Sequence, residues 1–102
     1  DGAESSIRAL PAIVDAVGSR IEVHMDGGIR SGQDVLKACA LGARGTYIGR
    51  AYNYGLGAMG EAGVTKVLEI IHRELDLTMA FCGRTELAHV DTSILVPGSF
   101  PA

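Results

Sequence analysis

Two arginines that each stand directly behind a glycine corner are the residues of this chain best suited to chemistry. Arg30 follows Gly27 and Gly28, and Arg50 follows Gly49. A guanidinium group can offer paired N–H donors to a phosphate, and glycines let backbone N–H groups approach the same anion closely. The two corners together therefore predict a grip for one phosphate group.

A short helix is expected to join the two corners. Ser31, followed three residues later by Asp34, is typical of a helix N-cap, and the apolar residues after position 34 recur at helical spacing. The helix should begin directly after Arg30, with its positive end toward the phosphate. The alternative at Asp26-Gly27 is a β-hairpin turn, but an alternating strand does not follow.

The elements around these corners predict alternating helices and strands. Helices are expected over about residues 7–17, 31–41, 51–59 and 61–81, and strands over residues 21–25 and 45–48. This order indicates parallel strands with right-handed crossovers. A parallel sheet needs helices or other strands over both faces and further strands at both edges, which two strands cannot provide for themselves. We therefore predict an α/β fold in which residues 1–92 are the last two strands and surrounding helices of a TIM (β/α)₈ barrel, followed by an irregular tail over 93–102.

Composition indicates a globular protein and excludes several classes. The 102 residues are 47% apolar and 21% charged, and the net charge of −3 argues against a nucleic-acid-binding surface. No apolar run is long enough to span a bilayer, and the N-terminus lacks a signal-peptide pattern. A soluble, cytoplasmic protein is the expectation.

The cysteines and histidines predict neither a metal site nor a catalytic centre. Cys39 and Cys82 lack metal-ligand spacing and are expected to be reduced and at least partly buried, and the three histidines lack ligand spacing as well. His24 is a tempting base because it stands two residues before Asp26. A lone histidine on an apolar strand is more often a packed or hydrogen-bonded core residue, so we assign it no catalysis.

A second glycine pattern, G-x-G-x-x-G over residues 55–60, is a weak nucleotide signal. A dinucleotide fingerprint must come directly off a strand and open a helix. Here residues 50–54 separate it from the expected strand, so these glycines are interpreted as helix and loop punctuation.

Four motifs, taken in order, resemble the C-terminal portion of the FMN-dependent α-hydroxy-acid dehydrogenases and oxidases. They are DGG-x-R at 26–30, ALGA at 40–43, IGR at 48–50 and GEAGV at 60–64, and the resemblance covers most of residues 1–90. The family includes L-lactate dehydrogenase, glycolate oxidase and mandelate dehydrogenase. Bacterial L-lactate dehydrogenases are most similar in two segments, EVHMDGGIRSGQDVLK and TYIGRAYNYGLGA.

The resemblance implies specific roles for five residues. In this family the aspartate of the first corner contacts the ribityl chain of FMN, which assigns that role to Asp26. The second glycine, the arginine and the later Gly-Arg pair hold the FMN phosphate, which assigns that role to Gly28, Arg30, Gly49 and Arg50. The implied reaction is oxidation of an L-2-hydroxy acid, here lactate, to the 2-oxo acid by transfer to FMN.

The resemblance places no catalytic residue within this sequence. The family's active-site histidine and substrate-binding arginine lie in an NHGGRQLDGA-like segment, of which Asp1-Gly2-Ala3 matches only the end. The expected partner is therefore the remainder of the barrel, and residues 1–102 alone are expected to be inactive. Two alternatives stay open: an inert fragment that retains at most phosphate binding, or another phosphate-binding TIM barrel, which GEAGV and TMAFCG disfavour.

Assembly and location follow from the resemblance alone. Family members are homo-oligomers, commonly tetramers, and use oxygen, a quinone or a cytochrome as electron acceptor. Bacterial lactate dehydrogenases are often attached to the inner membrane, so peripheral attachment there is the alternative to a free cytoplasmic enzyme.

Overall fold

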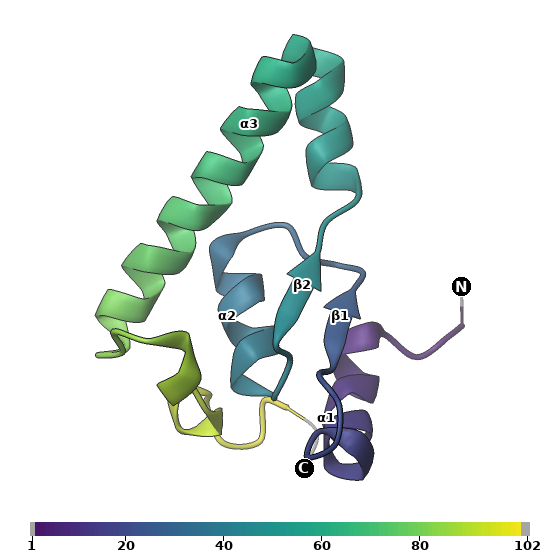
Figure 1. Ribbon diagram of the computed structural model, residues 1–102, viewed down its shortest axis with the longest axis vertical. Coiled ribbons are helices and arrows are strands. Elements are labelled where there is room, and N and C mark those ends of the chain that lie inside the picture. Colours follow the sequence, from purple (N-terminus) through teal and green to yellow (C-terminus); the bar gives the residue numbers. More distant parts are fainter. Residues whose placement is uncertain (1, 101–102) are drawn as a thin grey trace.

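Helices alternate with two short strands in the part of the chain that the computed structural model describes, residues 2–100 (Figure 1). In chain order the elements are α1 (Ser6–Val17), β1 (His24–Asp26), α2 (Gly32–Ala40), β2 (Gly45–Tyr47), α3 (Arg50–Phe81) and the 3₁₀ turns η1 (Leu87–His89) and η2 (Thr92–Ile94). The alternation predicted from the sequence is confirmed.

The two strands pair in parallel, as the order of elements predicted. The partners across the ladder are His24 and Gly45, Met25 and Thr46, and Asp26 and Tyr47. One further bond, from the Arg44 N–H to the Val23 carbonyl (2.8 Å), extends the pairing by a residue. The carboxyl ends of both strands therefore meet at the same edge of the sheet.

The first strand begins later than predicted. We expected it over 21–25, but β1 starts at His24, and Ile21 is 61% exposed in a bend. The reason is pairing rather than propensity, because β2 offers its first partner at Gly45 and residues before Val23 have no opposing strand within residues 2–100.

Helices α1 and α2 cover one face of the sheet and leave the other open. Met25 is buried in a core with residues from both helices and the adjoining loops, namely Leu10, Val23, Ile29, Ala38, Leu41 and Ala43. His24 and Asp26 alternate with Met25 and are exposed on the opposite face. Ile13 belongs to the apolar sequence pattern of α1 but is 48% exposed, so the buried stripe of α1 is narrower than that pattern.

A second core joins α2 to α3. Leu36 and Ala40 are buried against Val90, with Leu75 and Met79 of α3 packed around them. The helices come close because α2 begins with a glycine. A Cβ on Gly32 would lie 2.0 Å from the Leu75 backbone nitrogen.

Helix α3 is two helices joined by a kink, which matches the predicted break between residues 59 and 61. Met59 and Gly60 have non-helical backbone angles, with φ of +62° at Gly60, and the two arms fold back on each other at the apex of the molecule (Figure 1). Gly55 and Gly63 face each other there without side chains. Within the G-x-G-x-x-G run, Gly55 thus packs against the other arm and Gly60 lies in the kink, in line with the interpretation as helix and loop punctuation. Leu68, an apolar residue of the second arm, is 53% exposed.

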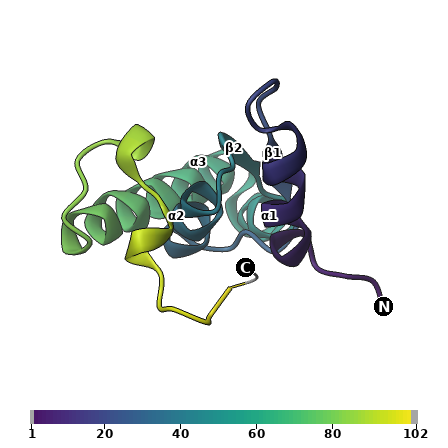
Figure 2. The ribbon, with the colours of Figure 1, turned by 90° about the horizontal axis from the view of Figure 1, so that it is seen from below.

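The C-terminal segment returns to the core instead of leaving it. After η2 it runs beneath α2 toward α1 (Figure 2), where Leu95 and Phe100 pack against the first core. Arg84 anchors its start by donating to the Ser93 hydroxyl (2.8 Å). Hydrogen bonds from the Ser93 hydroxyl and backbone N–H lower the pKa of Asp91, so this carboxylate favours the folded turn above its ordinary pKa and stops doing so as the pH falls through the lowered value.

The two cysteines are free and partly buried, as predicted. Burial raises the pKa of the Cys39 thiol, which keeps it in the unreactive protonated form at neutral pH. Among the described residues, no helix combines the length and the apolar character that crossing a membrane requires.

Candidate functional site

The five residues singled out from the sequence border one cavity at the carboxyl ends of the two strands. The cavity has a volume of about 470 Å³. Its walls are the corner after β1 and the end of β2 with the first turn of α3, namely Asp26, Gly27, Gly28, Ile29, Arg30, Tyr47, Gly49, Arg50, Ala51 and Asn53. The parallel pairing brings these two corners together, since both strands end at this edge.

The glycines open the backbone of both corners to the cavity. Gly27 and Gly28 have φ of +102° and +79°, a left-handed conformation that residues with a Cβ rarely adopt. No atom lies within 4 Å of a Cβ built on Gly28 or on Gly49. A ligand can therefore approach the main chain at both corners.

The two arginines have side chains that are exposed and available for binding. The ion pairs among residues 2–100 join histidines to glutamates, and neither Arg30 nor Arg50 takes part in one. Their guanidinium groups also make no side-chain hydrogen bond within the described part of the chain. Two unpaired cations at one cavity give it a positive potential suited to an anion with more than one charge.

Side chains accept hydrogen bonds from several N–H groups at the start of α2. The Asp34 N–H donates to the Ser31 hydroxyl (3.2 Å), as the predicted N-cap requires. The Arg30 N–H, just before the helix, donates to the Asp34 carboxylate (3.0 Å), and the Gly32 N–H donates to the Glu74 carboxylate of α3 (3.2 Å). That the positive end of this helix serves the phosphate stays a prediction.

The open helix end at the cavity belongs to α3. Its N-cap is Gly49, which makes no side-chain cap hydrogen bond, so the first N–H groups of α3 have no side-chain acceptor within residues 2–100. Arg50, Ala51 and Asn53 of this turn line the cavity. Unsatisfied N–H groups at a helix start favour an anion. The sequence signal for this was available: a glycine at the N-cap position instead of serine, threonine or aspartate.

Loss of the Ser31 cap should destabilise the protein modestly. We expect Ser31→Ala to lower the free energy of unfolding by about 1 kcal/mol, because the Asp34 N–H loses its acceptor. Ser5 is a matched control, since it stands at the N-cap of α1 without a side-chain cap hydrogen bond. Chemical denaturation of both variants should show a loss for Ser31→Ala alone, and equal losses would contradict the capping role.

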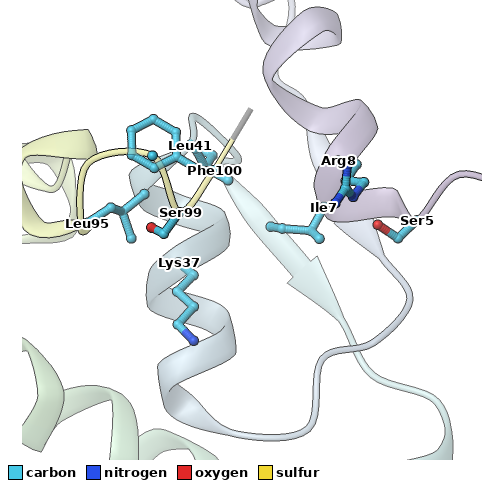
Figure 3. Close-up of a pocket in the computed structure, with 9 residues that line it drawn as sticks. Ser5, Ile7, Arg8, Lys37, Leu41, Leu95, Ser99 and Phe100 are labelled. Carbon is cyan, nitrogen blue, oxygen red and sulfur yellow. The ribbon is translucent and has the colours of Figure 1, made fainter. Parts of the chain in front are cut away.

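A second cavity, also of about 470 Å³, lies between α1, α2 and the C-terminal segment (Figure 3). Its floor is apolar, formed by Ile7, Leu41, Leu95 and Phe100. Arg8 and Lys37 stand at its rim, but in Figure 3 their side chains do not point toward each other. The cavity therefore lacks the paired cations that distinguish the one at the strand ends.

His24 lies on the open face of the sheet and not in the core. We expected a packed or hydrogen-bonded core residue. The imidazole is hydrogen-bonded, to Tyr47 and to Glu22, but its side chain is 37% exposed. Strand alternation explains the difference, because Met25 takes the buried face and His24 must point the other way. Among residues 2–100, no three His, Cys, Asp or Glu side chains gather as a metal site would need.

Comparison with known proteins gives consistent results. The family model described as FMN-dependent dehydrogenase matches residues 1–97. An L-lactate dehydrogenase of Caulobacter vibrioides is 56% identical over 95 residues, covering 93% of this chain and 25% of that protein. A pre-mycofactocin synthase of Mycolicibacterium smegmatis is 50% identical over 101 residues, covering 98% of this chain and 25% of that protein.

A solved structure has the same arrangement of elements. The monotopic membrane protein (S)-mandelate dehydrogenase superposes with a TM-score of 0.87 at 37% identity, over 92% of this chain and 25% of that one. The chain thus spans about a quarter of the length of the curated relatives it matches. These matches exclude the alternative that the chain is part of another phosphate-binding TIM barrel. The chain belongs to the FMN-dependent dehydrogenase family, and its two parallel strands and their helices correspond to part of that family's TIM barrel.

Proposed function

We propose that the cavity at the strand ends holds the phosphate of FMN in an enzyme that oxidises L-lactate to the 2-oxo acid. The observation that carries this proposal is the convergence of two unpaired guanidinium groups, from Arg30 and Arg50, with the open N-terminus of α3 on one cavity. Family membership supplies the cofactor, since the matching family is FMN-dependent.

The donor set fits a phosphate monoester. Arg30 and Arg50 each offer forked N–H donors, and two positive charges balance a phosphate dianion. The open backbone at Gly28 and Gly49 adds N–H groups that no side chain blocks. Asp26 stands at the same cavity and, as an acceptor-only carboxylate, suits hydroxyl groups such as those of the ribityl chain.

The residues of this chain bind and orient; the chemistry belongs to the cofactor. Bound FMN supplies the acceptor for the hydride equivalent that leaves the 2-hydroxy acid. By anchoring the phosphate at the strand ends, Arg30 and Arg50 fix where the rest of the flavin lies. We propose that the proton-accepting and carboxylate-binding groups come from barrel elements outside residues 1–102, so that these residues alone are catalytically inert, and that the whole enzyme is a homo-oligomer.

Sequence identity to relatives supports L-lactate oxidation as the reaction, and it also supports a second candidate reaction. The Caulobacter L-lactate dehydrogenase is 56% identical over the region compared. A second candidate is the reaction of a pre-mycofactocin synthase, because the relative of that name is 50% identical over 98% of this chain.

Anaerobic reduction of the flavin tests the substrate. We expect L-lactate to bleach the visible flavin absorption of the whole FMN-loaded protein, and D-lactate to leave it unchanged, because the proposed substrate is the L-enantiomer. (S)-mandelate should act more slowly than L-lactate. Flavin that stays oxidised with all three acids, in a protein that binds FMN, would contradict the proposed reaction and favour the second candidate.

A further inference from the structure

Three side chains on the open face of the sheet form a hydrogen-bond network. His24 Nδ1 lies 3.1 Å from the Tyr47 hydroxyl, and His24 Nε2 lies 3.3 Å from the Glu22 carboxylate. The imidazole and phenol rings are 5.8 Å apart, centre to centre, and inclined by 36°. None of these residues had a role in the site predicted from the sequence.

The hydrogen bonds among Glu22, His24 and Tyr47 depend on the register of both strands. His24 is paired with Gly45, and a Cβ on Gly45 would lie 3.2 Å from two atoms of the imidazole ring. The missing side chain at Gly45 therefore lets the ring lie across β2 and reach Tyr47, two residues further along. This contact is built into the strand pair and is not a chance approach of two surface side chains.

Tyr47 connects this hydrogen-bond network to the candidate cofactor site. It is paired with Asp26 in the ladder, and it lines the cavity at the strand ends. Helices α1 and α2 cover the Met25 face of the sheet, and in a (β/α)₈ barrel the helices form the outer layer. The face that carries His24 and Tyr47 is therefore the barrel interior.

We propose that Tyr47 is a further FMN-contacting residue and that His24 is the residue that positions it. This inference rests on the proposed function of the cavity. Glu22 fixes the tautomer, because a carboxylate only accepts hydrogen bonds and His24 Nε2 must then carry the hydrogen. In neutral His24 the remaining nitrogen, Nδ1, accepts from the Tyr47 hydroxyl.

With its hydrogen directed at His24 Nδ1, the Tyr47 oxygen keeps a lone pair that can accept a hydrogen bond from a hydroxyl group of a ligand in the cavity. The ribityl chain of FMN carries such hydroxyl groups. His24 therefore sets the direction in which the Tyr47 hydroxyl faces the ligand.

The test is FMN affinity of the whole protein, measured by flavin fluorescence at neutral pH. Tyr47→Phe and His24→Phe should each weaken FMN binding by about three- to tenfold, the effect of one hydrogen bond. His24→Asn keeps a polar atom near the Nδ1 position that can hold the Tyr47 hydroxyl. It should recover most of the affinity lost in His24→Phe.

Tyr54→Phe is the matched control, since Tyr54 is 74% exposed on α3 and lies away from the cavity lining. If Tyr47→Phe and His24→Phe bind FMN as tightly as this control while Arg50→Ala weakens FMN binding, the inference is wrong and the proposed function stands. If Arg50→Ala also leaves FMN binding unchanged, the proposed function fails and the inference with it.

Discussion

Replacing Arg50 with alanine in the whole protein should weaken FMN binding by about ten- to a hundredfold, the effect of losing charge-assisted hydrogen bonds worth about 1.5–3 kcal/mol. Arg50 is expected to have this effect because its guanidinium group is unpaired within residues 2–100 and stands at the open start of α3. Riboflavin, which lacks the phosphate, should bind the variant and the unchanged protein equally well. Equilibrium dialysis against each flavin measures both affinities.

Arg44 offers a matched control for that experiment. It is an exposed arginine directly before β2, at the opposite end of the strand from Arg50 and outside the cavity lining. Arg44→Ala removes the same charge from the protein and should leave FMN affinity unchanged. If both variants lose FMN affinity equally, or if Arg50→Ala weakens riboflavin as much as FMN, Arg50 does not hold the phosphate.

Gly63→Ala is expected to destabilise the whole protein by about 3 kcal/mol, the upper part of the range for overpacked sites. A Cβ at Gly63 would lie 1.8 Å from the Gly55 carbonyl oxygen and 2.6 Å from its carbon. Both are backbone atoms, so the two arms of α3 would have to separate. Urea denaturation followed by circular dichroism measures the change in the free energy of unfolding.

Gly57 is the internal control on the same helix. Nothing lies within 4 Å of a Cβ built on it, and its backbone is helical. Gly57→Ala should therefore stabilise the protein by up to about 1 kcal/mol, as alanine does in an open helical position. A similar loss of stability in both variants would mean that helix propensity, and not the close contact of the two arms, decides the effect.

The corners of the site could be predicted because their signals are local. A glycine pair that allows left-handed φ, an arginine directly behind it and a serine cap are written within a few residues, and the structure places Gly28, Arg30 and Ser31 accordingly. The parallel pairing also followed from the order of elements alone. Neither prediction required knowledge of which distant segments touch.

The features that were missed depend on neighbours in space. The Gly32 N–H is occupied by Glu74, a residue 42 positions away, so the sequence around α2 could not reveal that this donor is taken. The late start of β1 likewise depends on where Gly45 stands, and the exposure of Ile13 depends on how widely α1 contacts the sheet. His24 was placed in the core by its apolar neighbours, although strand alternation with Met25 points it outward.

A crystal structure of the whole protein with bound FMN is the sharpest test of the proposed phosphate site. We expect the phosphate to lie at the carboxyl ends of β1 and β2, with the guanidinium groups of Arg30 and Arg50 and the first N–H groups of α3 within hydrogen-bonding distance of its oxygens. A phosphate bound at the N-terminus of α2 without the α3 donors would contradict the site described for this chain. A phosphate bound away from both arginines would contradict the function as well.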